Sequence, residues 1–123
     1  MTPHVVVVDN NPMDLEFLCY LLTAAGCRVT AADSVEGGLA AMRESVPDLI
    51  ISDLNLPHRS GFYFLKRVKE EERWKEIPFV LISATSHANA DVQRALSMGA
   101  AKYILRPIEP QALLAEIEPY LKQ

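Results

Sequence analysis

Cysteine and glycine are both scarce in this sequence, and neither residue forms a recognised motif. Cys19 and Cys27 are its 2 cysteines, and they lack the C-x-x-C spacing of redox and zinc-binding motifs. Reduced thiols in a cytosolic chain are therefore the simplest interpretation. The adjacent Gly37 and Gly38 belong to no phosphate-cradling sequence. These absences exclude a disulfide scaffold and a glycine-rich phosphate loop.

The chain also lacks long apolar runs and a large excess of either charge. Its N-terminus, MTPHVVVV, has neither the basic region nor the long apolar region of a signal peptide, and no stretch approaches the length of a membrane span. The net charge is -4 and no block of five or more like-charged residues occurs, so no nucleic-acid footprint is indicated. We expect a cytoplasmic protein that binds proteins or small ions, with no direct contact to nucleic acid or membrane.

The sequence does contain enough apolar material for one compact core. Hydrophobic residues make up 50% of the 123 positions, and a chain of this length is too short for two ordinary domains. We therefore treat residues 1–123 as one domain. The sequence ends at Gln123, and we expect either a stand-alone protein or one domain cut from a longer one.

Five short apolar runs recur along the chain, each rich in aliphatic or β-branched residues. They are VVVV at 5–8, RVTAA at 28–32, DLIIS at 48–52, PFVLIS at 78–83 and KYILR at 102–106. The segments that follow each run have apolar residues at spacings of three and four, which predicts helices. The predicted helical faces contain Leu15, Leu18, Cys19 and Leu22; Leu39, Met42 and Val46; Phe62, Leu65 and Val68; Val92, Ala95 and Leu96; and Leu113, Leu114 and Ile117. Five strands are thus expected to alternate with five helices.

Several residues mark the expected helix ends. Gly26 and Gly99 stand where the first and fourth helices should end, a position typical of glycine caps. Asn11, followed by a proline and then by Asp14, is typical of a helix N-terminal cap. Pro119 should kink or end the last helix.

Regular alternation of strand and helix predicts an α/β fold. Such chains form βαβ units, whose right-handed crossovers give a parallel sheet covered by helices on both faces. The apolar runs are continuous rather than alternating, as burial on both faces requires. The predicted fold is a doubly wound (βα)5 three-layer sandwich with a five-stranded parallel sheet. Ligands of such folds bind beyond the carboxyl ends of the strands.

Polar residues stand at four of the predicted strand ends. Asp9 follows the first run and Asp53 follows the third. Ser83 ends the fourth run and Arg106 ends the fifth. Because the carboxyl ends of parallel strands meet at one edge, we expect these four side chains to lie together. Each would cost desolvation energy unless it is paired, so core packing does not explain them.

This set of groups suits a phosphoryl group and a divalent metal ion. Mg²⁺ prefers oxygen ligands and keeps several waters, so Asp9 and Asp53 could supply its protein ligands. A carboxylate can also attack phosphorus and form an acyl phosphate if a cation neutralises the developing charge. In this interpretation Asp53 accepts the phosphoryl group, Arg106 is the cation, and Ser83 donates a hydrogen bond to a phosphoryl oxygen.

Four segments carry a resemblance to a known family. VVVVDNNP, PDLIISDLNLP, PFVLISA and MGAAKYILRP, in this order, resemble the receiver domain of two-component response regulators. The resemblance covers nearly the whole chain and implies a flavodoxin-like fold, as in chemotaxis regulators, with strand order 2-1-3-4-5. It also implies a signalling domain that takes a phosphoryl group from a sensor histidine kinase or a phosphotransfer protein and switches its binding to a downstream effector. Its only catalysis would be its own phosphorylation and dephosphorylation.

The resemblance also implies roles for individual residues at the metal site. Asp53 is the implied phosphoacceptor, and Asp9 with Asn10 stands at the position of the family's acidic pair. Asp53 and the backbone carbonyl of Asn55 complete the implied Mg²⁺ ligand set.

Two further positions match the family's switch. Ser83 fills its Ser/Thr position and Tyr103 its aromatic position. The implied response draws Ser83 and its loop toward the phosphoryl group and lets Tyr103 move, which alters the face of the fourth and fifth helices. Such a modification shifts an equilibrium between two states of the domain. A homodimer through the last helices is a further expectation by analogy.

Two residues depart from the family pattern. Asn10 replaces an acid that is usually a metal ligand, so we expect weak Mg²⁺ binding. Arg106 replaces a lysine, and its planar fork can grip a phosphate through two parallel hydrogen bonds. We therefore hypothesise that the longer cation bridges Asp9 and Asp53 and partly replaces the charge of the metal.

These departures leave one main alternative open. Asn10 and Arg106 favour a degenerate receiver that binds partners independently of phosphorylation. Two enzyme classes share the fold, but the segment DNNPMD lacks the hydroxyl- and glycine-rich phosphate loop of a flavodoxin. An aspartyl phosphatase would need paired acids two residues apart, and positions 11 and 55 are asparagines.

The three histidines are expected to play no part in this chemistry. His4, His58 and His87 are scattered along the chain without metal-ligand spacing. We expect them to be exposed residues of the terminus and of loops.

Overall fold

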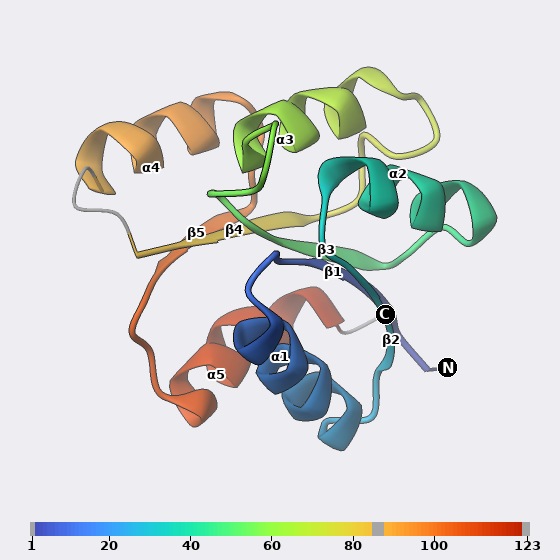
Figure 1. Ribbon diagram of the computed structural model, residues 1–123, viewed down its shortest axis with the longest axis vertical. Coiled ribbons are helices and arrows are strands. Elements are labelled where there is room, and N and C mark those ends of the chain that lie inside the picture. Colours follow the sequence, from blue (N-terminus) through green and yellow to red (C-terminus); the bar gives the residue numbers. More distant parts are fainter. Residues whose placement is uncertain (1, 85–87, 122–123) are drawn as a thin grey trace.

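The described part of the chain alternates strand and helix in the predicted order (Figure 1). The computed structural model describes residues 2–84 and 88–121. Its strands are β1 (His4–Val8), β2 (Arg28–Ala32), β3 (Leu49–Asp53), β4 (Phe79–Ser83) and β5 (Lys102–Leu105). Its helices are α1 (Pro12–Ala24), α2 (Val35–Glu44), α3 (Gly61–Glu70), α4 (Ala88–Ser97) and α5 (Pro110–Leu121). The predicted strands and helices are therefore confirmed.

The five strands form one parallel sheet in the order β2-β1-β3-β4-β5. The register brings the strand ends nearly level. Val8 of β1 pairs with Ser52 of β3, and the next residue of β3, Asp53, pairs with Ile82 of β4. Ser83 in turn pairs with Leu105 of β5. The residues that end these strands consequently share one edge of the sheet.

Helices cover both faces of the sheet and create two apolar cores (Figure 1). Side chains of β1 alternate between them: Val6 and Val8 enter one core, and Val5 and Val7 enter the other. The first core contains Val35, Leu39, Met42, Phe62, Phe64, Leu65, Val68 and Ala95 of α2, α3 and α4. The second contains Leu18, Leu21, Leu22, Leu113 and Ile117 of α1 and α5. Burial on both sides explains why the strands are apolar without interruption.

The helix caps agree with the sequence prediction. Asn11 caps α1, and its side-chain oxygen accepts hydrogen bonds from the backbone N–H groups of Met13 and Asp14 at 3.0 and 3.1 Å. Gly26 and Gly99 follow α1 and α4 with φ of 93° and 99°. Glycine adopts this left-handed conformation without a steric penalty, which explains its presence at both helix ends.

Two details of the predicted helices are wrong, and a third, that Pro119 kinks or ends the last helix, is wrong as to the ending. Val46 lies beyond the end of α2 and Leu96 lies on the outer side of α4, so each is 50% exposed. Ala95 is the residue of α4 that enters the core. Pro119 does not end α5, which continues to Leu121. A proline removes one hydrogen bond, from its own N–H to the carbonyl four residues earlier, and α5 continues past Pro119 without it.

His4 is also misjudged from the sequence. It is the first residue of β1, and its side chain is buried rather than exposed. Its Nε2 lies 2.8 Å from the Thr30 hydroxyl, and its backbone N–H donates to the Asp48 carboxylate at 2.8 Å. Burial lowers the pKa of His4, aided by the charge of Arg28. His58 is exposed as expected, and His87 lies outside the described residues.

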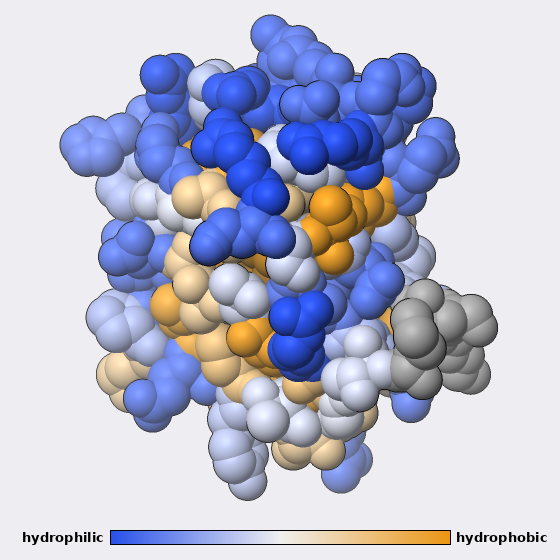
Figure 2. Space-filling view, turned by 90° about the vertical axis from the view of Figure 1, so that its right-hand side faces the viewer, coloured by the Kyte–Doolittle hydropathy of each residue, from blue (hydrophilic) through white to orange (hydrophobic). Residues whose placement is uncertain are grey.

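The outer surface shows no sign of a membrane-spanning element. Figure 2 shows the side of the molecule that lies on the right in Figure 1, where β2 forms the edge of the sheet. Hydrophobic residues are visible in the middle of this face, and hydrophilic residues lie above them and at the sides. Across residues 2–84 and 88–121, every helix is too short or too polar to cross a bilayer.

Gly61 allows α3 to begin directly beside the end of β3. A Cβ at this position would lie 2.6 Å from the backbone oxygen of Asp53 and 3.0 Å from Cα of Leu54. Its own N–H donates to the Leu54 carbonyl at 2.7 Å. Only a residue without a side chain fits here, because backbone atoms cannot move aside as a flexible side chain can.

We predict that Gly61→Ala lowers the free energy of unfolding by about 1–3 kcal/mol, the usual cost of overpacking. Urea unfolding would measure the loss. Gly37→Ala is the matched control, because a Cβ there would meet side-chain atoms of Ala32 and Ser34 no closer than 3.2 Å. Equal losses in the two variants would show that the contact with the Asp53 backbone is not tight.

Candidate functional site

Asp9 is the most deeply buried carboxylate of the site. Its side chain is 0% exposed at the end of β1, where the chain turns into α1. One carboxylate oxygen, Oδ1, accepts the backbone N–H of Asn11 at 3.0 Å. The other, Oδ2, accepts a hydrogen bond from Nη2 of Arg106 at 2.8 Å. Both oxygens thus have a short contact, which offsets the cost of burying the charge.

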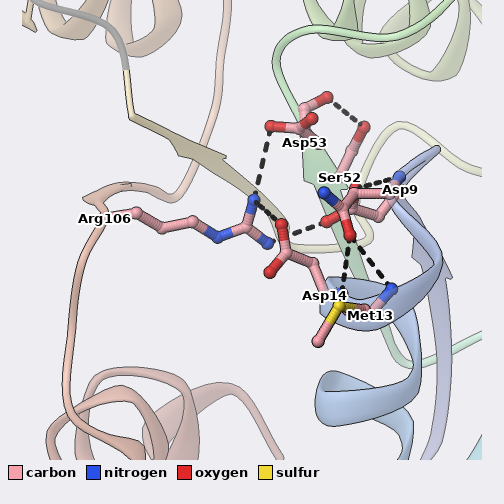
Figure 3. A network of polar contacts seen from close by, with 7 residues as sticks. Asp9, Met13, Asp14, Ser52, Asp53 and Arg106 are labelled. Atoms are coloured by element: carbon pink, nitrogen blue, oxygen red, sulfur yellow. Dashed lines mark hydrogen bonds and ion pairs between the residues drawn. The ribbon is translucent and has the colours of Figure 1, made fainter.

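Arg106 reaches this carboxylate from the opposite side of the site (Figure 3). It follows β5, and its backbone N–H donates to the Ser83 carbonyl at 2.9 Å. Its Nη1 lies 3.4 Å from Oδ2 of Asp14 and 3.7 Å from Oδ1 of Asp53. The hypothesised bridge between Asp9 and Asp53 is therefore present, and Asp14 is a third carboxylate at the same guanidinium.

Asp53 ends β3 with its side chain 11% exposed. The residue before it, Ser52, is buried, and its hydroxyl donates to the Asp53 carbonyl at 2.9 Å. With Gly61 packed against the same carbonyl, the backbone at the end of β3 is fixed on two sides. The carboxylate consequently has a defined position at the edge of the sheet.

The surroundings of Asp53 disfavour its charged form. Burial raises the pKa of its carboxyl, and the negative charge of Asp9 raises it further. The charge of Arg106 and hydrogen bonds from the backbone N–H groups of Asn55 and Leu54 lower it, but the net pKa is about 6. Asp53 is therefore mostly ionised at neutral pH, although its charge is poorly solvated.

Ser83 and Tyr103 lie on the neighbouring strands β4 and β5. Ser83 is the last residue of β4 and is fully buried. Tyr103 of β5 pairs with Leu81 and packs against the core under α2, α3 and α4. Its hydroxyl is buried and has no hydrogen-bond partner among the residues that the structure describes.

Asn10 and Asn55 occupy more open positions than the carboxylates. Both are exposed, Asn10 after β1 and Asn55 after β3. Asn55 contributes its backbone N–H to the Asp53 carboxylate. The roles predicted for the Asn10 amide and for the Asn55 carbonyl as metal ligands stay predictions.

The donor set suits Mg²⁺ in kind but not in its present arrangement. Carboxylates such as Asp9 and Asp53 are ligands that Mg²⁺ prefers. Both already pair with Arg106, and the two Asp9 oxygens each have a short partner. Within the described ranges, no three His, Cys, Asp or Glu side chains are grouped to hold a metal. A divalent ion would compete with the guanidinium for these carboxylates.

A cavity of about 370 Å³ opens beside the guanidinium, between α1 and the segment that connects β5 to α5. Arg106 and Asp14 form its polar end. The rest of its lining is mainly apolar, with Phe17, Leu18, Ile82, Ala84, Pro107, Ile108 and Leu113. Arg106 and Asp14 are thus the charged groups of the site that a molecule in this cavity would contact.

Two residues of the site were not predicted to belong to it. Asp14 was assigned only to the cap of α1, and Ser52 only to a strand. The position of Asp14 in the first turn of α1, directly after the loop that carries Asp9, places it at the same edge of the sheet. This position was a usable signal. The hydrogen bond from the Ser52 hydroxyl to the Asp53 carbonyl depends on a side-chain rotamer, which the sequence pattern does not reveal.

Comparisons with known proteins agree with this geometry. A family model described as the response regulator receiver domain matches residues 5–118. The chain is 36% identical over 109 residues to the two-component response regulator ORR5 of Oryza sativa subsp. japonica. This alignment covers 88% of this chain and 81% of ORR5.

Two bacterial proteins extend the comparison. The phosphate regulon transcriptional regulatory protein PhoB of Escherichia coli (strain K12) is 31% identical over 123 residues, an alignment that covers 100% of this chain and 53% of PhoB. The chain thus spans about half the length of that relative. The solved structure of the chemotaxis response regulator CheY4 of Vibrio cholerae superimposes with a TM-score of 0.91 at 26% identity, covering 98% of this chain and 100% of that one.

The raised pKa of Asp53 predicts a stability effect with a definite sign. A carboxyl with a folded-state pKa of about 6 instead of 3.8 disfavours folding when it is ionised. This penalty is complete above pH 6 and is relieved as the pH falls toward 4. We expect Asp53→Asn to raise the free energy of unfolding at pH 7.5, on the order of 1–3 kcal/mol.

Urea unfolding of both proteins from pH 4 to 8 would measure this difference. The increase in the free energy of unfolding caused by Asp53→Asn should shrink steadily below pH 6. Asp33→Asn, which removes an exposed carboxylate, is the control for a general change in net charge. A gain that does not vary with pH, or a loss at pH 7.5, would contradict a raised pKa at Asp53.

Proposed function

The chain belongs to the family of response regulator receiver domains, and on this premise we propose that Asp53 accepts a phosphoryl group. Phosphorylation of an aspartate is general to this signalling family. The observation that carries the proposal is the environment of Asp53 at the end of β3. Its carboxylate is partly desolvated, ionised at neutral pH and 3.7 Å from a guanidinium nitrogen. Such a group is a nucleophile beside a cation that can stabilise the incoming charge.

The phosphoryl group comes from a sensor histidine kinase or a phosphotransfer protein. Asp53, Ser83 and Arg106 are the proposed catalytic residues, and the domain also promotes loss of its own phosphoryl group. Ser83 lies one residue beyond the position in β4 that pairs with Asp53, which supports a hydrogen bond from its hydroxyl to a phosphoryl oxygen. The site is cytoplasmic in this proposal, as its kinase partner requires.

Tyr103 transmits the change to the binding surface together with Ser83. Its buried hydroxyl has no described hydrogen-bond partner, so an outward movement breaks no such bond. Modification of Asp53 then shifts the equilibrium between two positions of this side chain, and a downstream effector binds one of them. A homodimer through α4 and α5 is one form that this effector contact takes.

Magnesium binding by this chain is weak. The proposed ligands are Asp9, Asn10, Asp53 and the backbone carbonyl of Asn55. A neutral amide at Asn10 supplies less charge than a second carboxylate, and Arg106 pairs with the remaining acids. Both features lower the affinity for a divalent ion.

One alternative is a degenerate receiver that works as a phosphorylation-independent interaction module. The pairing of Arg106 with Asp9 and Asp53 favours it, because this contact satisfies the acidic site without a metal or a phosphoryl group. The two functions differ in one chemical property, which is whether Asp53 becomes modified.

Intact-mass measurement after incubation with acetyl phosphate and Mg²⁺ distinguishes them. We expect the mass of one phosphoryl group to be added to the wild-type chain, because Asp53 is ionised and lies beside a cation. Asp53→Asn should show no addition. An unmodified wild-type chain under conditions that modify a known receiver domain would favour the degenerate module.

A further inference from the structure

Arg106 lies among three carboxylates, Asp9 and Asp14 from the segment where β1 leads into α1 and Asp53 from the end of β3 (Figure 3). Nη2 contacts Asp9 at 2.8 Å, and Nη1 lies 3.4 Å from Asp14 and 3.7 Å from Asp53. The arginine side chain is 20% exposed, so part of this charge cluster is shielded from water. Coulomb attraction between such groups is stronger than at an open surface. The guanidinium is therefore held at a fixed place between Asp9 and Asp53.

This place is the one that a divalent ion would need. A metal between Asp9 and Asp53 requires an oxygen from each, and the guanidinium is paired with both. The remaining Asp9 oxygen accepts the Asn11 N–H and faces the backbone instead. A metal at Oδ2 of Asp9 competes with the 2.8 Å contact from Arg106, and weakening that contact costs part of a buried charged hydrogen bond.

We propose that Arg106 is a built-in counterion that competes with divalent ions for Asp9 and Asp53 and neutralises the phosphoryl group in their place. Modification of Asp53 then proceeds without a metal. This inference depends on the proposed phosphoacceptor function and adds how the site is controlled. The counterion role goes beyond weak Mg²⁺ binding, because with it the phosphorylation of Asp53 needs no metal.

The contacts of Arg106 suit this role. The distance of 3.7 Å between Nη1 and Asp53 is longer than a hydrogen bond. Nη1 can therefore still donate a hydrogen bond on this side, to an oxygen of a phosphoryl group bound to Asp53. Asp9 holds Nη2 at the same time, and Asp14, half-exposed on α1, holds Nη1 in a contact that solvent weakens. Arginine offers several donors in one plane, so it can keep Asp9 and take a phosphoryl oxygen together.

The reaction with acetyl phosphate balances without a metal or a proton. An oxygen of the Asp53 carboxylate attacks phosphorus, and a new O–P bond forms. The bond between phosphorus and the acetyl oxygen breaks, and its electron pair leaves with acetate. The phosphoryl group carries its negative charge from the donor to Asp53, where Arg106 faces it.

The first test measures metal binding and does not depend on phosphorylation. Mg²⁺ is titrated into the wild-type chain, Arg106→Gln and Arg106→Lys, with the backbone amide NMR signals of residues 9, 10, 53 and 55 as the readout. We expect Arg106→Gln to bind Mg²⁺ at least about tenfold more tightly than wild type, the scale on which contacts beside a metal act. Arg106→Lys should also bind more tightly, because an ammonium has one nitrogen and cannot contact Asp9 and Asp53 through two separate nitrogens as the guanidinium does.

Arg43→Gln is the matched control, since it removes the same charge from an exposed position in the last turn of α2. It should leave Mg²⁺ affinity unchanged. Arg106→Lys keeps the cation beside Asp9 and so covers the case in which Arg106→Gln does not fold. Equal Mg²⁺ affinity in wild type and the folded Arg106 variants would overturn the proposal.

The second test separates this inference from the proposed function. Wild-type chain is incubated with acetyl phosphate in Mg²⁺ or in EDTA, and intact mass is followed with time. Rates within about twofold of each other support the built-in counterion. Modification in Mg²⁺ alone would overturn the counterion and leave the phosphoacceptor function in place. No modification in either solution would overturn both.

Discussion

The contact between Asp9 and Arg106 is the constraint on which the site depends. Asp9 is fully buried at the end of β1, and an unpaired carboxylate there would cost several kcal/mol. Arg106 reaches it from β5, on the far side of β3 and β4, and thereby fixes the guanidinium over the intervening strand ends. Asp53 ends β3, one of these intervening strands. The pairing of Arg106 with the buried Asp9 therefore also places the guanidinium beside the Asp53 carboxylate.

The backbone around the site limits how far these groups can move. The N–H of Asn11 holds one oxygen of Asp9, and Ser52 and Gly61 fix the carbonyl of Asp53. Such support matters because electrostatic stabilisation requires charges that are oriented before the reaction begins. The guanidinium end of Arg106 borders a cavity together with Asp14, so this end of the charge cluster is the one reached from the side of α1.

The sequence predicted the sheet well because both of its faces are buried. Continuous apolar runs located every strand to within one residue at each end, and the residues that follow them formed the predicted edge. The hypothesised bridge of Arg106 followed from the departures at Asn10 and Arg106 from the family pattern, together with the charge and length of the arginine. Asp14 was missed because its cap position already explained it. Leu96 and His4 were misjudged because periodicity does not determine which apolar residue of a helix faces the core, nor whether a terminal histidine pairs inside the sheet.

The most direct test of this account is a double-mutant cycle between Asp9 and Arg106. Unfolding free energies of wild type, Asp9→Asn, Arg106→Gln and the double variant give the coupling between the two side chains. A buried, hydrogen-bonded ion pair predicts a favourable coupling of about 1–3 kcal/mol, largely unchanged by added salt. Additive effects, with a coupling of less than about 0.5 kcal/mol, would show that Arg106 is not held by Asp9 and would contradict the account.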